Sequence, residues 1–173
     1  MNRRTTVTLS TIALLFLALA LPAGDAFAQQ KSLKEQLVGA WTLVSFDSFD
    51  AAGKKVPNME GRDIKGLLIL TNNGRLSFQI ITEFPKIASK ERLKTTPAED
   101  TAVAHGVLSY FGTYTVSEAD KTINYRIERS SFPNQVTGAD AKRVATLTGD
   151  ELKLDNPART AGGKTVTVWR RTK

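Results

Sequence analysis

The sequence contains no cysteine and a single histidine, His105, among its 173 residues. Without cysteine the chain forms no disulfide, so its fold in an oxidising compartment has to be held by burial and hydrogen bonding alone. One histidine without cysteine does not make a zinc site of the usual kind, and no run of Asp and Glu has the spacing of a calcium-binding loop. We predict no metal and no cofactor.

Catalytic and nucleotide-binding motifs are also missing. No Gly-x-Ser-x-Gly turn occurs, which leaves a hydrolase of that type without support. Residues 162–165, Gly-Gly-Lys-Thr, resemble the end of a phosphate-binding loop. That loop needs a glycine where Ala158 stands and a helix where we predict a strand, so we interpret the glycines as a turn.

The 24 basic and 17 acidic residues give a net charge of +7, and the charged residues are spread along the chain with no block of one sign. The sequence has no basic stripe interleaved with aromatic residues, so we predict no nucleic-acid partner. The imidazole of His105 titrates near neutral pH, as a general base requires. Its position beside Ala104 and Gly106 in a predicted helix favours an exposed or capping residue instead.

The longest apolar run, residues 12–22, follows Arg3 and Arg4 and precedes Ala26-Phe27-Ala28. This order is typical of a secretory signal peptide with a small-residue cleavage site. A membrane anchor is the alternative, but the run is shorter than the ~20 residues of a spanning helix. No cysteine follows the run to carry a lipid. We predict a cleavable signal peptide at 1–28, one domain at 29–173, no integral membrane segment after cleavage, and a periplasmic or secreted location.

The predicted domain is a succession of strand patterns separated by turn signals. Asn73-Gly74 joins two of them, and Asn-Gly is a strong hairpin signal because both residues tolerate positive φ. An eight-stranded antiparallel up-and-down barrel closes such a succession without an open edge and leaves room for one small ligand. The eight predicted strands are residues 41–49, 66–71, 75–82, 110–117, 122–131, 142–148, 151–155 and 164–171.

Two helical segments accompany the strands. Ser32 and Glu35 form a capping box ahead of the first strand, and we place that single turn as a plug under one end of the barrel. Thr96, a following proline and Glu99 begin a second helix, which we expect to end around Leu108. The second helix interrupts the succession of strands, and the sheet stays antiparallel.

The first and last strands carry matching residues. Gly39-Ala40-Trp41 opens the first strand, and Trp169-Arg170-Arg171 lies in the last. A Gly-x-Trp here, with an arginine of the last strand packed across the indole, resembles the calycin pattern. We assign Gly39, Trp41, Arg170 and Arg171 structural roles, and Arg171 is the one expected inside because it shares a face with Trp169. Such stacking contributes roughly 0.5–2 kcal/mol.

Three further stretches extend this resemblance: residues 37–41, 110–114 and 147–154. In this order they resemble the bacterial and fungal lipocalin-like domain family over nearly the whole mature chain. Residues 131–133, Gly138 and Arg143 match the later Pro, Gly and Arg spacing of that family. Relatives often carry a histidine in the strand after the Tyr-x-Gly-x-Tyr stretch, and residues 122–128 contain none. The resemblance implies an all-β, lipocalin-like barrel and leaves its activity open.

Several polar and aromatic residues alternate with apolar neighbours along the predicted strands. If their face is the lumen, they line a mostly apolar pocket with a few polar groups, as a small-molecule site requires. If half of them face solvent, the lumen is filled by aliphatic and aromatic side chains instead. The predicted ligand-binding residues are Ser45, Gln79, Tyr110, Tyr114, Tyr125, Arg129 and Arg143.

We predict a binding protein for a small hydrophobic or amphipathic molecule. A carboxylate or carbonyl on that molecule would suit Arg129 or Arg143, because guanidinium offers a planar fork of donors. One alternative is an isomerase or cyclase in which Tyr114 and Tyr125 donate protons and Glu128 is the base. Another is an interaction or structural barrel without a cavity, marked by an apolar patch on its outer wall.

Overall fold

Neighbouring strands of the sequence pair with each other through most of the fold, as their short turns require. The structure is a computed structural model, and it describes residues 31–57, 63–135, 141–158 and 162–173. The predicted signal peptide and Gly138 lie outside the described residues. The elements are α1 Leu33–Leu37, β1 Gly39–Phe49, β2 Lys55–Val56, β3 Lys65–Leu70, β4 Arg75–Ile81, α2 Pro97–Gly106, β5 Val107–Ser117, β6 Thr122–Ser130, η1 Pro133–Gln135, β7 Ala141–Thr148, β8 Glu151–Asn156 and β9 Lys164–Arg171.

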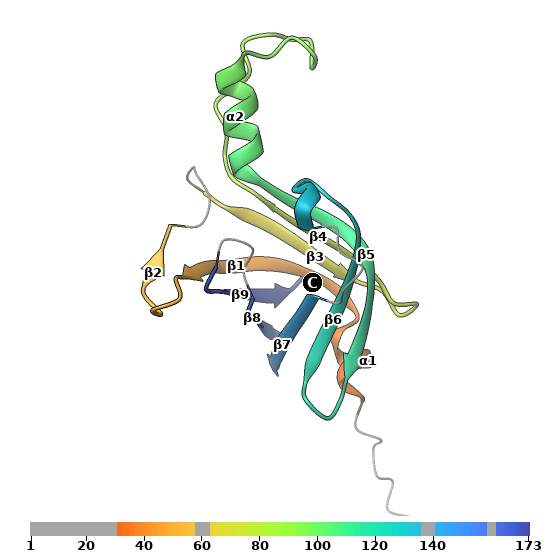
Figure 1. Ribbon diagram of the computed structural model, residues 1–173. Helices are drawn as coiled ribbons and strands as arrows, with labels where there is room; N and C mark the ends of the chain where they lie inside the picture. Colours follow the sequence, from red (N-terminus) through yellow and green to blue (C-terminus); the bar gives the residue numbers. More distant parts are fainter. Residues whose placement is uncertain (1–30, 58–62, 136–140, 159–161) are drawn as a thin grey trace, which may run out of the picture. The chain divides into compact units, whose positions relative to one another are not determined.

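The strands close into a barrel (Figure 1). Strands β3 to β9 pair antiparallel in sequence order, β1 pairs with β3, and β1 also pairs with β9. The predicted eight-stranded antiparallel up-and-down barrel is therefore confirmed. The short strand β2 was not predicted, and it pairs only with the end of β1, at Ser48 and Phe49.

The hairpin between β3 and β4 forms where it was predicted, but its turn differs from the expected type. Gly74 has a positive φ of 80°, whereas Asn73 does not. The Gly74 amide donates to the carbonyl of Thr71 (3.0 Å), and the Thr71 amide donates to the carbonyl of Arg75 (2.9 Å). One glycine with positive φ after an ordinary turn is enough to reverse the chain here.

Two β-bulges break the alternation of the strands. In β1, Leu43 pairs with Trp169 and Ser45 with Val168, which leaves Val44 as the extra residue. In β6, Arg129 pairs with Phe111 and Ile127 with Gly112, which leaves an extra residue between them. A bulge moves every later side chain of its strand to the opposite face. Both bulges decide which residues reach the lumen.

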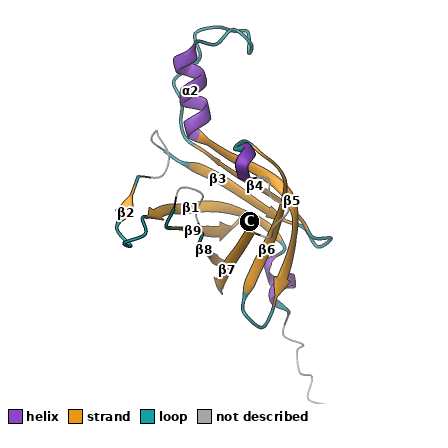
Figure 2. Cartoon of the chain, viewed as in Figure 1, coloured by secondary structure: helices purple, strands orange, loops and turns teal. Residues whose placement is uncertain are grey.

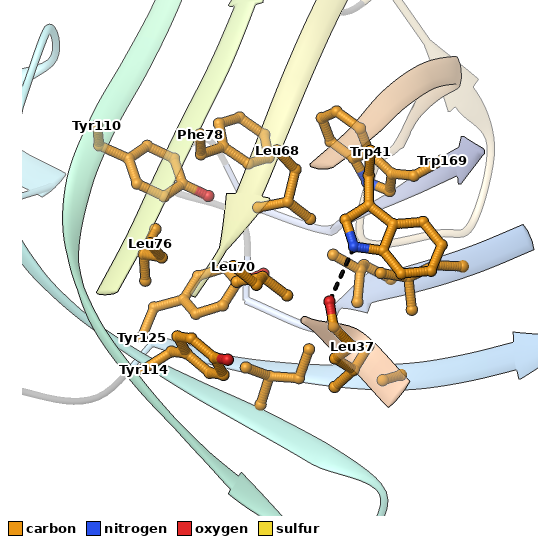
Figure 3. Packing of buried hydrophobic residues seen from close by; sticks show 14 of the residues in the cluster. Leu37, Trp41, Leu68, Leu70, Leu76, Phe78, Tyr110, Tyr114, Tyr125 and Trp169 are labelled. Atoms are coloured by element: carbon orange, nitrogen blue, oxygen red, sulfur yellow. Dashed lines mark hydrogen bonds between the residues drawn. The ribbon is translucent and has the colours of Figure 1, made fainter. Parts of the chain in front are cut away.

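Helix α1 closes one end of the barrel. Ser32 and Glu35 make the predicted capping box, and Leu33 and Leu37 are buried in the barrel core. The indole Nε1 of Trp41 donates to the carbonyl oxygen of Leu37 (2.9 Å), which Figure 3 shows as a dashed line. The helix and the first strand are therefore joined inside the core by a satisfied hydrogen bond.

Arg171 joins this end to the last strand. Its guanidinium lies 4.1 Å from the centre of the Trp41 ring and donates to the carbonyls of Gln36 (2.5 Å) and Val38 (3.0 Å). Gly39 has φ +139°, and a Cβ there would meet Arg171 Nη1 at 3.1 Å, so glycine suits both the backbone and the close arginine. The side chain of Arg170 is exposed on the outer face of β9.

Helix α2 lies at the opposite end of the barrel, between β4 and β5 (Figure 2). It ends at Gly106, two residues before the predicted end, and β5 begins at once at Val107. Gly106 is its only buried residue, and the exposed fraction of the Val103 side chain is 38%. The helix has no apolar stripe to pack on the barrel, so most of it stands clear of the wall.

Candidate functional site

A cavity of about 270 Å³ occupies the end of the barrel at which α2 ends and β5 begins. Its walls come from the second half of β1, the beginnings of β5 and β9, the middle of β4 and β6, the first half of β7 and the end of β8. The last turn of α2 and helix η1 lie at its edge. The lining residues are Phe46, Ser48, Phe78, Ala104, His105, Val107, Leu108, Tyr110, Tyr125, Phe132, Gln135, Arg143, Leu154, Asn156, Thr165 and Thr167.

Aromatic rings form one wall of this cavity. Phe78 and Tyr110 stack with their ring centres 4.4 Å apart and their planes 7° apart, side by side in Figure 3. Trp169 meets Phe78 edge-on at 5.4 Å, and Tyr125 lies 6.3 Å from Tyr110. The lining rings of this group come from β4, β5 and β6, whereas Trp169, on β9, contacts Phe78 but does not line the cavity. A ligand in the cavity would meet flat, rigid apolar surface on this side.

Arg143 supplies the positive charge of the site. Its side chain is buried, with 8% of the residue exposed, and its guanidinium carbon lies 5.4 Å from the centre of the Tyr125 ring. Nη1 donates to the carbonyl of Lys142 (2.9 Å) and to Oδ1 of Asn156 (3.0 Å). No carboxylate lies within ion-pairing distance of Arg143 in the part of the chain that the structure describes.

Four buried residues of the lining carry a hydroxyl group: Ser48, Tyr110, Tyr125 and Thr167. Burial raises the pKa of Tyr110, and the charge of Arg143 and a hydrogen bond to it partly oppose the shift. Burial also raises the pKa of Tyr125, so both phenols stay protonated at neutral pH and remain donors. The Tyr125 hydroxyl and Ser48 Oγ are fully buried, and neither has a hydrogen-bond partner among the described residues.

Of the seven predicted ligand-binding residues, Tyr110, Tyr125 and Arg143 come together in this cavity. Gln79 is exposed on the outer face of β4, because its neighbour Phe78 faces the lumen. Tyr114 is buried toward the α1 end, where its hydroxyl donates to the carbonyl of Thr71 (2.8 Å).

Ser45 and Arg129 do not line the cavity either, and the two bulges explain both positions. Ser45 follows the extra residue of β1, and Arg129 follows the extra residue of β6. At both positions the inward and outward alternation is therefore the reverse of the one predicted from the sequence. Arg129 is exposed, and its Nη1 donates to the carbonyl of Glu128 (2.8 Å). In β1 the same reversal brings Phe46 and Ser48 to the lumen in place of Ser45.

The sequence reasoning missed five polar residues of the lining: Ser48, Gln135, Asn156, Thr165 and Thr167. Asn156 orients Arg143, and Thr167 accepts a hydrogen bond from the indole of Trp169 (2.7 Å). Thr167 alternates with Trp169 along β9 and was detectable from that pattern. His105 is exposed in the last turn of α2, as favoured from the sequence, and it also lines the edge of the cavity.

The groups considered for an isomerase or cyclase do not meet. Glu128 lies outside the cavity lining and forms an ion pair with Arg75, which lowers the pKa of that carboxyl. Tyr114 lies toward the other end of the barrel and already has an acceptor in Thr71. Tyr125 is the one member of this set in the cavity, and it has no base beside it from this set.

The outer wall carries exposed apolar residues, but polar residues separate them. Leu67 pairs across the strands with Gln79 and Thr42, and Ile81 pairs with Lys65 on one side and with half-buried Val107 on the other. Phe111 lies between Ser77 and Arg129. A contiguous apolar face, which an interaction barrel requires, does not form along these pairings.

A metal site and a membrane-spanning helix are both absent from the described ranges. No group of three or more His, Asp and Glu side chains there is arranged to hold a metal ion. No helix in those ranges is both long enough and apolar enough to span a bilayer.

Comparison with known proteins agrees with the geometry of the barrel. A search of curated proteins finds no match. A family model described as a lipocalin-like domain matches residues 38–172, from the end of α1 to the residue after β9. That match covers the whole closed sheet, including the strands that carry Arg143 and the Trp41–Arg171 contact. The chain therefore belongs to the lipocalin-like domain family.

Proposed function

We propose that this protein binds a small, mostly apolar molecule with an anionic or carbonyl group in the cavity at the α2 end of the barrel. The observation that carries this proposal is a buried cation, Arg143, in a cavity whose other walls are largely aromatic and aliphatic. Small-molecule sites combine such apolar walls with a few placed polar groups. The cation would hold the polar end of the ligand, and the rings would hold the remainder.

Native mass spectrometry tests this proposal with a panel of small apolar acids, amides and alcohols. Leu108 lines the cavity and is half-buried, so Leu108→Trp places a large ring in the lumen at modest risk to folding. Val144→Trp adds the same ring to an exposed position of β7 and is the matched control. We expect one-to-one adducts with the wild type and with Val144→Trp, and loss of them in Leu108→Trp.

Absence of every adduct, or adducts that survive in Leu108→Trp, would overturn the proposal. Circular dichroism of both tryptophan variants shows that any loss of binding comes from a filled lumen and not from an unfolded chain. The result does not depend on which member of the panel binds, so it tests the location of the site alone.

We also propose that the chain is exported, to the periplasm or out of the cell, and loses residues 1–28. The charged start, the apolar run and Ala26-Phe27-Ala28 support this proposal. Expression of the full chain in a bacterial host should give a periplasmic or secreted product that begins at Gln29. Ala28→Arg should block cleavage, because the cleavage site requires small residues. A cytoplasmic product that retains Met1 would contradict export.

A further inference from the structure

Two unpartnered hydroxyl groups point to the chemistry of the ligand. Four buried hydroxyls in the described residues have no hydrogen-bond partner, and two of these, Ser48 Oγ and the Tyr125 hydroxyl, belong to the cavity lining. Their residues are 1% and 0% exposed. The other two, on Thr82 and Thr122, lie outside the lining. Buried polar groups in folded proteins almost always have partners, so we expect the lining pair to gain one when a ligand enters the cavity and the side chains around these hydroxyls shift.

The nature of that partner follows from what the lining offers. Ser48 and Tyr125 each have a hydroxyl hydrogen to donate, and Arg143 offers a guanidinium with no carboxylate within ion-pairing distance in the described chain. A buried charge is costly unless an opposite charge and hydrogen bonds accompany it. A group that accepts several hydrogen bonds and carries one negative charge meets all three requirements. A carboxylate is such a group.

The aromatic wall of the cavity favours a flat ring. Phe78 and Tyr110 present a stacked pair from the adjacent strands β4 and β5. Ser48 and Arg143 come from β1 and β7, each two strands away from this pair around the barrel, and Arg143 reaches the Tyr110 hydroxyl. Aromatic pairs prefer offset stacks or edge-to-face contacts, and a planar ligand can join such a pair without strain.

The volume limits the size of the ligand. An apolar cavity of about 150 Å³ holds benzene, so the 270 Å³ here corresponds to roughly eleven non-hydrogen atoms. A long-chain fatty acid exceeds that size, whereas one ring with a short acidic side chain fits it. We propose that the lumen is selective for a compact aromatic carboxylate, whose carboxylate is held by Ser48, Tyr125 and Arg143 and whose ring lies against Phe78 and Tyr110. This inference rests on the proposed lumen site.

Isothermal titration with three probes tests the inference. Cinnamate has the predicted ring, size and charge, cinnamamide has the same shape without the charge, and palmitate has the charge on a long aliphatic chain. We expect one-to-one binding of cinnamate about tenfold or more tighter than of cinnamamide. Palmitate should bind more weakly than cinnamate.

Equal affinities for the acid and the amide, tighter binding of palmitate, or no binding of cinnamate would each overturn the inference. Lumen binding itself would still stand if other members of the panel bind and Leu108→Trp removes them. The two proposals therefore fail in distinguishable ways.

The hydroxyl groups are tested by a matched set of variants. Ser48→Ala and Tyr125→Phe should each weaken cinnamate binding several-fold, about the effect of one lost hydrogen bond to a charged group. Neither should lower the melting temperature, since each removes a hydroxyl that has no partner in the protein. Thr122→Val removes an unpartnered hydroxyl away from the lining and should leave binding unchanged. Unchanged cinnamate affinity in both lining variants would contradict the assignment.

Discussion

The two ends of the barrel use the same kinds of side chain in different ways. Each end has an arginine over an aromatic ring: Arg171 at 4.1 Å from Trp41 at the α1 end, and Arg143 at 5.4 Å from Tyr125 at the α2 end. Arg171 donates to two backbone carbonyls, and Trp41 donates to Leu37. Arg143 and Tyr125 border a cavity, and the Tyr125 hydroxyl has no partner.

This difference separates stability from binding along the barrel axis. Where the polar groups are satisfied within the protein, their loss should cost free energy of folding. Where they face a cavity without partners, their loss should cost affinity and leave folding largely intact. The comparison predicts opposite outcomes for chemically matched substitutions at the two ends.

The largest effect is expected for Trp41→Ala. The indole is fully buried, stacks under Arg171 and is hydrogen-bonded to Leu37, so its removal leaves a large cavity and a guanidinium without its ring. We expect a loss of about 3–5 kcal/mol in the free energy of unfolding, measured by urea denaturation. A loss below about 1 kcal/mol would show that the α1 end does not hold the barrel closed.

The two arginines give the next test. Arg171→Met should lower the free energy of unfolding by roughly 2–3 kcal/mol, because the carbonyls of Gln36 and Val38 lose their donor. Arg143→Met also takes a donor from the carbonyl of Lys142 and Oδ1 of Asn156, but it removes a buried cation that has no ion pair in the described chain. Because the second effect offsets the first, the net change should be less than about 1 kcal/mol.

Cinnamate titration completes this comparison. Arg143→Met should lose most of its affinity, whereas Arg171→Met should keep it wherever the protein remains folded. Arg126→Met removes an exposed arginine from β6 and is the control for net charge. Equal losses of affinity in Arg126→Met and Arg143→Met would mean that charge acts at long range and not within the cavity.

Two tyrosines sharpen the contrast with a smaller change. The Tyr114 hydroxyl donates to the carbonyl of Thr71, so Tyr114→Phe leaves a part-buried carbonyl unpaired and should cost about 1–2 kcal/mol. Tyr125→Phe removes a hydroxyl without a partner and should be neutral or stabilising. Thermal unfolding of both variants measures the difference, and destabilisation by Tyr125→Phe as large as by Tyr114→Phe would contradict it.

The smallest effect concerns pH and the α1 end. Glu118 accepts hydrogen bonds from the amides of Leu33 and Lys34, and these bonds lower the pKa of its carboxyl below the ordinary value of 4.5. A pKa lower in the folded state contributes stability that is present above the unfolded pKa and lost as pH falls through the folded pKa. As the pH is lowered below about 4.5, the melting temperature should fall less steeply in Glu118→Gln than in the exposed control Glu83→Gln. If the melting temperatures of the two variants fell equally steeply with pH, the Glu118 carboxylate would not stabilise the start of α1.

The sequence was enough to predict the barrel and its closed end. Strand patterns, the hairpin turns and the capping boxes are local signals, and they agree with the observed elements to within a few residues. The contact between Trp41 and an arginine of the last strand also followed from a motif. Helix α2 was predicted, but its exposure was not, because a helix with few apolar residues gives no direction for packing.

The lumen was only partly predictable, because its lining depends on bulges. A bulge arises from the pairing of distant strands, and the residues of β1 around Val44 give no local sign of one. A hint exists for β6: Gly112 lies opposite its bulge, and a Cβ there would come within 2.0 Å of the carbonyl oxygen of Arg126. A glycine inside a strand often marks such a close approach. Arg143 lies on β7, where the alternation is unbroken, and its position followed from the sequence.

A crystal structure of the protein grown with cinnamate is the most direct test of the contrast between the two ends. The account predicts one cinnamate in the lumen at the α2 end, with its carboxylate within hydrogen-bonding distance of Arg143 and its ring against Phe78 and Tyr110. The Trp41–Arg171 end should be unchanged. A lumen filled by side chains, or a carboxylate bound at the α1 end or on the outer wall, would contradict the account.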